Sequence, residues 1–524
     1  MFSLENSLHF EEICDLFIQN KIIETTKNLP KPKKTLPQKM VQGGAWISSL
    51  KIIRKILSLI RLIIIGRILA PSDFGLMGIA LLTMSALETF STFGFRQALI
   101  QKKEDINDYL DAAWTVLIIR GLVIFIVIII LAPYISLFFH TPAVKPLIQA
   151  LGFIFFLRAF HNIGVVFFRK ELEFNKVFIY RFLGISTNFI VAVSAAIILR
   201  SVWALVLGLF AENIVNLIVS YLIHPYRPHL SKDIGKAKEL FGFGKWILGS
   251  SILVFIGKHI DDIFVGRVLS ASALGFYQMA YRISNMLETE ITQVISSVAF
   301  PAFAKIQDKQ SRIQKAYFRI MRLTIAISLP ITVGMILLAP EFTQIFLSEK
   351  WMPMVTAMQL LAVAGLIKSI VSTGSPLFVG SGFPNYEFYM QLVRGLIIII
   401  VIYPLIVFMG ISGAAIGVIL SIAGMLVIWY PLSQKITRAP WRKYFDTFWP
   451  PLFCSLLMAG SIYLAKLYWN PIQQPLGLAM FVFVTIVIMS ICIYITFMYL
   501  LQRCYPHYDI FGEVKYLYKS LRGR

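Results

Sequence analysis

The sequence is poor in charged residues, which make up 15% of its 524 residues, whereas 57% are hydrophobic. Soluble domains carry about a quarter charged residues, so this shortage indicates that lipid surrounds most of the chain. Cysteine is also scarce, and the spacing of Cys14, Cys454, Cys492 and Cys504 matches no metal site. We expect these side chains to act as small hydrophobic groups rather than as ligands or disulfides.

Sequence motifs of soluble enzymes are missing as well. There is no P-loop, no metal-ligand cluster, and no nucleophile at motif spacing from a base, so we predict that the chain is not an enzyme. The start, MFSLENSLHFEEICDLF, is not a cleavable signal, because acidic residues stand where a basic region and an apolar core are needed. Instead, long apolar runs such as GLVIFIVIIILA recur along the chain. A bilayer core of about 30 Å needs about twenty such residues per helix, so the runs predict membrane-spanning helices.

These runs predict an all-α polytopic membrane protein with about fourteen transmembrane helices. The expected spans lie near 46–66, 75–95, 112–132, 147–168, 178–199, 202–223, 246–266, 280–300, 320–339, 354–376, 391–409, 411–431, 446–467 and 475–500. Lysine and arginine gather in alternate loops, and such loops stay in the cytoplasm. Both termini are therefore expected inside the cell, with the chain in the cytoplasmic membrane. The net charge of +22 reflects this loop pattern and not a nucleic-acid partner.

An internal repeat connects two distant segments. GAWISSLKIIRKILSLIRLIIIGRILAPSDFG matches GKWILGSSILVFIGKHIDDIFVGRVLSASALG at a constant offset of 200 positions. Identical pairs include Trp46 and Trp246, Gly66 and Gly266, Arg67 and Arg267, and Gly75 and Gly275. Because six spans fill each unit, both units enter the membrane from the same side. Parallel repeats of this kind are typical of transporters in which the substrate path runs between the halves.

The repeat also predicts how the chain is divided. The expected parts are a polar cytoplasmic extension over 1–40, an N-lobe over 41–235, a C-lobe over 236–435, two extra helices within 436–502 and a cytoplasmic tail over 503–524.

Charged residues inside spans are costly and commonly face a polar cavity. The span near 280–300 has a polar stripe at three- and four-residue steps, from Gln278 to Ser296, that cannot face lipid. The predicted lining has a positive net charge, which suits an anionic headgroup such as a pyrophosphate. Candidates for binding this headgroup are Arg54, Arg61, Lys258 and Arg282. Candidates for ion coupling are Glu88, Asp261, Asp262 and Glu288.

Each candidate also has a structural interpretation. Arg54 lies near the cytoplasmic end of its span and can extend to the headgroups. Asp261 stands where the first unit has an arginine, so a buried structural ion pair is the alternative. Glu88 and Glu288 can hydrogen-bond neighbouring helices. His259 is either a proton relay or a packed neutral side chain.

Three regions of the sequence carry a family resemblance. They are GRILAPSDFGLMGIALL with STFGFRQALIQKKE, then RKELEFNK, and then AFPAFAKIQDKQSRIQKAY. These segments resemble polysaccharide-export flippases of the Wzx type, in the multidrug/oligosaccharidyl-lipid/polysaccharide flippase superfamily. The resemblance covers roughly residues 41–435.

The resemblance implies a V-shaped, two-lobed helical transporter that works by alternating access. It would carry an undecaprenyl-pyrophosphate-linked oligosaccharide to the outer leaflet, with membrane lipids and other polysaccharide assembly proteins as further partners. No cofactor is implied beyond a coupling proton or sodium ion.

Related lipid-linked peptidoglycan-precursor flippases contact the anionic substrate through an arginine six positions before a second one, the spacing of Arg61 and Arg67 here. We carry this role over to Arg61. Asp261 departs from a symmetric cationic pair, and the polar extension before the first span departs from the family pattern.

Two other functions are weighed against the flippase. A multidrug exporter of the same fold would take cationic drugs and favour an acidic cavity, which the basic lining opposes. A membrane polysaccharide polymerase or ligase is expected to have a large outer loop with catalytic residues, which this sequence does not contain. The sequence names neither the glycan nor the coupling ion.

Overall fold

The computed structural model describes residues 36–91, 107–231, 244–285, 299–300, 302–307, 309–469, 472, 474–505 and 512. The regular structure within these residues is helical. The first half of the chain forms α2 (Leu36–Ile68), α3 (Pro71–Phe90), α5 (Asn107–Phe138), α6 (Val144–Ala159), η1 (Ile163–Val166), α7 (Phe167–Lys170), α8 (Phe174–Leu199) and α9 (Trp203–Ile223). We call this group the N half.

The C half follows. It consists of α11 (Gly244–Val268), α12 (Ala271–Ser284), α14 (Gln310–Phe342), η2 (Thr343–Leu347), η3 (Glu349–Met354), α15 (Val355–Ser372), α16 (Gly374–Gly380), α17 (Pro384–Thr437), α18 (Trp441–Tyr468) and α19 (Leu476–Cys504). The predicted boundary between residues 235 and 236 lies outside the described residues. Of the predicted extension over 1–40, residues 36–40 already belong to α2, and the remainder is outside the described residues.

The chain is an all-α, multi-pass membrane protein with about fourteen helices, as the sequence predicted. Nine helical segments of the described residues are long and apolar enough to cross a membrane. The helices α2 and α11 are long, but each carries several charged residues, whereas α6 and α12 are short.

The start of the second helix in each half follows from its sequence. Pro71 opens α3, where a missing N–H costs nothing. The Asp73 carboxylate accepts a hydrogen bond from the Ala70 N–H at 3.0 Å. In the C half, Ser270 is the cap of α12, and its hydroxyl accepts a hydrogen bond from the Ala273 N–H at 3.1 Å. Helices α3 and α12 thus begin at positions 200 residues apart, in register with the repeat.

The long helix α17 is interrupted at Gly410, where φ is +59° and ψ is −137°. Only glycine adopts such angles readily, so the helical path breaks there. The Cα of Gly413 lies close to the Leu405 carbonyl on the other side of the break, which a side chain at this position would not permit. The predicted spans 391–409 and 411–431 are the two parts of α17 on either side of Gly410.

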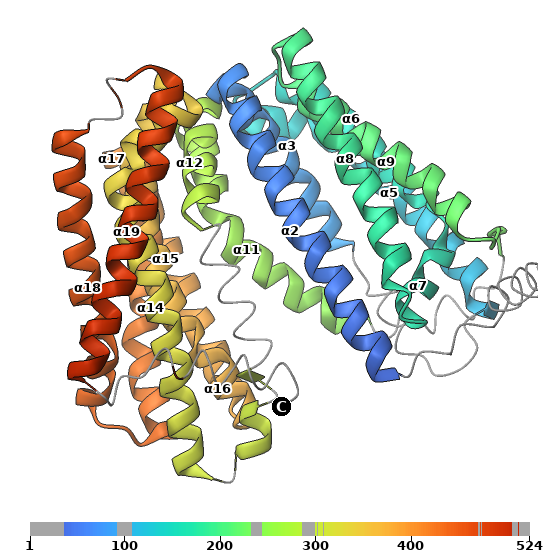
Figure 1. Ribbon diagram of the computed structural model, residues 1–524. Helices are drawn as coiled ribbons and strands as arrows, with labels where there is room; N and C mark the ends of the chain where they lie inside the picture. Colours follow the sequence, from blue (N-terminus) through green and yellow to red (C-terminus); the bar gives the residue numbers. More distant parts are fainter. Residues whose placement is uncertain are drawn as a thin grey trace, which may run out of the picture.

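The two halves meet at one end of the molecule. In Figure 1 they lie side by side beside α3 and α12 and diverge toward the end where α2 begins. We call these the seam end and the splayed end. The helix α11 crosses the space between the halves, and Phe255 packs edge-to-face on Phe90 of α3, with ring centroids 5.6 Å apart.

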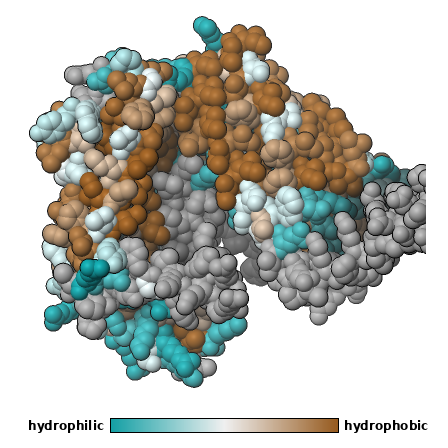
Figure 2. Space-filling model, in the orientation of Figure 1, coloured by the Kyte–Doolittle hydropathy of each residue, from teal (hydrophilic) through white to brown (hydrophobic). Residues whose placement is uncertain are grey.

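Hydrophobic side chains cover the outside of both halves. Figure 2 shows brown side chains over the middle of each half and teal side chains toward the splayed end. Ile198 and Phe408 are 79% and 85% exposed, an arrangement that suits contact with lipid and not with water. The extra helices α18 and α19 pack against α14, and Lys466 forms an ion pair with the buried Glu341 at 2.6 Å.

Candidate functional site

A cavity of about 220 Å³ lies between the two halves, next to the seam. It is lined by Ser58, Arg61, Leu62, Ile65, Phe74, Met77, Gly78, Leu81, Leu205, Leu209, Gly275, Gln278, Met279 and Arg282. These residues come from α2, α3 and α9 of the N half and from α12 of the C half. The structure therefore brings the predicted Arg61 and Arg282 together around one space.

Arg61 projects from the last third of α2 and is held by the N half. Its guanidinium donates a hydrogen bond to the Asn188 side-chain oxygen of α8. The Asn188 amide in turn donates to a carboxylate oxygen of Glu212, on α9, at 2.7 Å. Because the amide accepts on one side and donates on the other, its orientation is fixed, and the Arg61 guanidinium is held with it.

Arg282 projects from α12 and has no such support. Among the described residues, its side chain has no hydrogen bond or ion pair, and it is exposed where it lines the cavity. A guanidinium has five N–H donors, and water or a ligand in the space around it can accept hydrogen bonds from them. The free donors of Arg282 are therefore available for an anion.

The predicted acidic residues of α11 lie behind this cavity, in the C half. Asp261 is buried at 6% exposure and accepts a hydrogen bond from the Tyr277 hydroxyl at 2.7 Å. Asp262 accepts one from the Gln278 amide at 3.2 Å, and His259 lies 3.4 Å from its other oxygen. Because Gln278 lines the cavity, its amide connects the Asp262 carboxylate to the space between the halves.

The remaining predicted residues lie elsewhere. Arg54 and Lys258 are exposed and are not among the residues that line this cavity, so their predicted role in binding the headgroup stays a prediction. Glu88 is exposed near the end of α3 and forms a 3.7 Å ion pair with Arg158. Glu288 lies outside the described residues.

Sequence reasoning missed Asn188 and Glu212. Glu212 stands inside the predicted span 202–223, so the rule that carboxylates within spans are functional would have found it. Asn188 is a neutral residue in a long apolar run and gave no signal. Its role depends on α2 and α8 lying side by side, which one sequence does not reveal.

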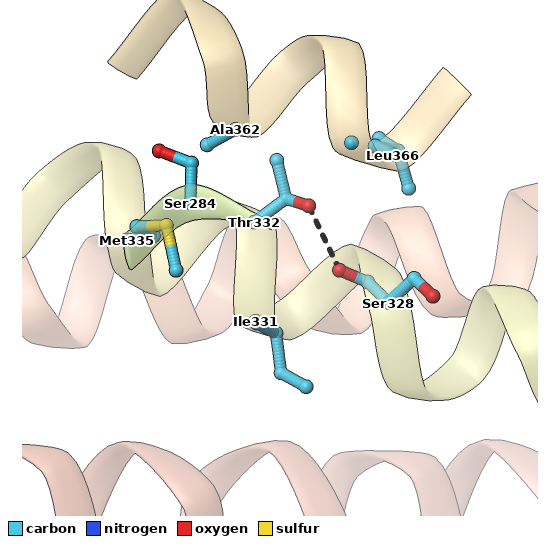
Figure 3. A pocket seen from close by; sticks show the side chains of 8 residues that line it. Ser284, Ser328, Ile331, Thr332, Met335, Ala362 and Leu366 are labelled. Atoms are coloured by element: carbon cyan, nitrogen blue, oxygen red, sulfur yellow. Dashed lines mark hydrogen bonds between the residues drawn. The ribbon is translucent and has the colours of Figure 1, made fainter. Parts of the chain in front are cut away.

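A second, smaller space lies within the C half between α12, α14 and α15. It is lined by Ser284, Ser328, Thr332 and apolar side chains (Figure 3). The Thr332 hydroxyl donates to the Ser328 carbonyl at 2.9 Å, and the Ser284 hydroxyl donates to Met358 O at 2.8 Å. In Figure 3 the hydroxyls of Ser284 and Ser328 point to opposite ends of the space. These groups do not converge on one ligand, and among the described residues no cluster of His, Cys, Asp and Glu could hold a metal ion.

Comparison with known proteins shows which family the chain matches. Residues 64–356, which are 293 of the 524 residues, match the family described as "Polysaccharide biosynthesis protein". The lipopolysaccharide biosynthesis protein WzxC of Escherichia coli (strain K12) is 25% identical over 433 residues, covering 80% of this chain and 86% of the relative. The predicted resemblance to Wzx-type proteins is confirmed.

Solved structures share the fold. The lipid II flippase MurJ in an inward closed conformation superposes with a TM-score of 0.69 at 15% identity, covering 87% of this chain and 98% of MurJ. An inward-facing multidrug resistance MATE family transporter gives a TM-score of 0.58 at 16% identity, covering 76% and 98%. Both solved proteins are transporters, so the chain has a fold that transporters share, which agrees with the prediction of a transporter rather than an enzyme.

Proposed function

Because the chain belongs to the polysaccharide biosynthesis protein family and has the fold of a lipid flippase, we propose that it moves a lipid-linked oligosaccharide across the cytoplasmic membrane. The cargo is an undecaprenyl-pyrophosphate-linked oligosaccharide for surface polysaccharide, taken from the inner to the outer leaflet. Membrane lipids surround the protein, and other polysaccharide assembly proteins supply the cargo and receive it.

One observation carries this proposal: Arg61 and Arg282, from opposite halves, line the same cavity. A diphosphate is dianionic or more, and guanidinium groups bind its oxygens through paired, charge-assisted hydrogen bonds. Burial in a membrane strengthens this attraction, because little water competes for the charge. A cationic drug would be repelled by the same pair, which argues against the multidrug-exporter alternative.

The size of the cavity indicates which part of the cargo it holds. At about 220 Å³, the cavity is smaller than the pockets of roughly 300–1,000 Å³ that enclose drug-sized ligands. It suits the diphosphate and not a whole oligosaccharide. The glycan extends from there into the space toward the splayed end, and the lipid chain stays in the bilayer.

Transport then follows alternating access between two six-helix lobes arranged as a V, with α18 and α19 as additions to the C-lobe. In this arrangement the splayed end faces the cytoplasm, where the basic loops and both termini lie. The seam end faces the outside and is closed. A diphosphate bound by one arginine from each half couples the motion of the halves to the presence of cargo.

Ion coupling is proposed for the carboxylates of α11. Asp261 and Asp262 are adjacent in sequence, and two neighbouring negative charges in a buried site favour binding of a proton or a sodium ion. The Gln278 amide connects Asp262 to the cavity wall. Glu88 and Glu288 remain further candidates.

Deleting the gene and analysing the lipid-linked oligosaccharides tests the proposal. Cargo should accumulate on the cytoplasmic leaflet, and the wild-type gene should restore export. R61A and R282A should each fail to restore it at normal protein levels. As a matched control, K145A removes an exposed lysine at the seam end and should export normally. Normal export by R61A or R282A would refute their assigned role, and the absence of cargo accumulation would refute the transport function.

A further inference from the structure

The seam between the halves contains a pair of glycines related by the repeat. A Cβ added to Gly75 would lie 1.6 Å from the Ala271 carbonyl oxygen, and one added to Gly275 would lie 2.0 Å from the Pro71 carbonyl oxygen. Positions 71 and 271 are themselves related by the offset of 200. Each half therefore presses its glycine against the helix start of the other half, as the contacts around a two-fold axis require.

The ends of α2 and α11 continue this reciprocal pattern. Arg67 donates hydrogen bonds to two carbonyl oxygens of the C half, that of Phe346 at 2.9 Å and that of Ile345. Arg267 stands at the equivalent position and reaches into the N half. One of its nitrogens lies 2.6 Å from a ring nitrogen of His140, and its guanidinium stacks over Phe138 at 5.4 Å.

The C half also caps the end of α2. The last carbonyls of a helix have no partner within the helix, and cations near them are stabilising. Lys350 donates to the Arg67 carbonyl at 2.7 Å, and Trp351 donates to the Gly66 carbonyl at 2.8 Å. Trp351 is fully buried between Phe74 of α3 and Phe276 of α12.

We propose that Arg67 and Arg267 form a two-part latch that holds the seam end shut, each arginine clasping the opposite half. Opening the seam requires both arginines to leave their partners, because both contacts cross the same interface. The Arg67 part is the stronger, since it includes two charge-assisted hydrogen bonds and two capping contacts. The Arg267 part has one polar partner and one ring. This latch gives the proposed transporter a seam that opens stepwise, weak part first.

Labelling of a cavity cysteine from outside the cell tests the latch. Ser58→Cys places a thiol in the cavity, in a background in which the native cysteines are replaced by serine or alanine. A membrane-impermeant maleimide should label it slowly while the seam is shut. R67A should raise the labelling rate by about tenfold or more, as the loss of one charge-assisted hydrogen bond predicts. R267A should raise it less, and the double variant most.

Matched variants separate the latch from general damage. K145A removes a positive charge at the same end without touching the other half and should leave the rate unchanged. G75A forces the seam apart through backbone contact and should raise labelling without altering either arginine. G44A, whose Cβ would meet nothing within 4 Å, is its control. Melting temperatures in detergent show which variants are folded.

The outcomes also distinguish the latch from the proposed orientation on which the assay rests. Fast labelling of the wild-type Ser58→Cys protein from outside would mean that the splayed end faces outward, which refutes the orientation; labelling from the cytoplasmic side in inverted vesicles then tests the latch in the same way. Unchanged labelling in folded R67A and R67A/R267A, while G75A labels faster, would overturn the latch.

Discussion

The two halves share a repeat but carry opposite charges at the same position. In the N half, Arg61 is held by Asn188 and Glu212 and faces the cavity. In the C half, the equivalent Asp261 is buried behind the cavity and bonded to Tyr277. The C half instead contributes Arg282, whose counterpart in the N half is the buried Leu82. The two halves therefore share the scaffold of the repeat, but each contributes one arginine to the cavity from a different helix, α2 in the N half and α12 in the C half.

Under the proposed function, this difference lets a pseudo-symmetric molecule bind an asymmetric cargo. A diphosphate joined to a lipid on one side and a glycan on the other has two unlike ends. Two arginines at equivalent positions would present the same geometry from both halves. Arginines from α2 and α12 approach instead from different helices, one held by a hydrogen-bond network and one free to move.

The largest effect is expected from making the N half resemble the C half. Arg61→Asp removes the fork of donors and places a second carboxylate beside Glu212. In the proposed function, Arg61 and the diphosphate form a buried charge pair. Removing one partner of such a pair costs about 2–5 kcal/mol, so export should fall by about thirtyfold or more. Measuring surface polysaccharide against protein level checks this. Arg61→Lys keeps the charge without the fork and should be intermediate; wild-type export by Arg61→Asp would break the comparison.

The second-largest effect on export is expected from changing Asp261. Asp261→Asn keeps the shape, and the Tyr277 hydroxyl can still donate to the amide oxygen. If Asp261 couples an ion to transport, export should drop by about tenfold and lose its sensitivity to an uncoupler or to sodium. The melting temperature should stay the same or rise, because a buried charge without a full partner is costly. A drop in melting temperature with unchanged export would assign Asp261 a purely structural role.

Sequence alone predicted much of this fold, because its signals are local. Apolar runs located most of the long helices, and the offset of 200 aligned α3 with α12. The hydrogen bond from Arg67 to the Phe346 carbonyl and the one from Arg61 to Asn188 could not be predicted. Both depend on which helix faces which across the molecule, and helical periodicity defines the face of a helix but not its neighbour.

A smaller effect is expected from the residues that position Arg61. Glu212→Gln preserves an oxygen that can accept from Asn188 but removes the negative charge, so export should fall only about threefold. Glu212→Ala also leaves the Asn188 amide without a partner, and the buried donor costs about 1–3 kcal/mol. The alanine variant should therefore lose both export and melting temperature. Equal effects of the two variants on export, with equal melting temperatures, would show that charge alone matters.

The smallest effect is expected at His259, whose counterpart in the N half is Leu59. Its nearest oxygen on Asp262 is 3.4 Å away, beyond the usual 2.7–3.2 Å of an N–H···O hydrogen bond, and its ring packs on Phe255 with centroids 4.8 Å apart. A proton relay needs an aligned hydrogen bond to the carboxylate it serves, whereas a packed ring needs only its shape. His259→Leu, which makes this position match the N half, should therefore change export by less than about twofold across external pH. If export falls by about tenfold in His259→Leu, and other apolar residues of similar size at this position do not restore it, the imidazole carries protons to Asp262. The C half would then have a function that the N half lacks.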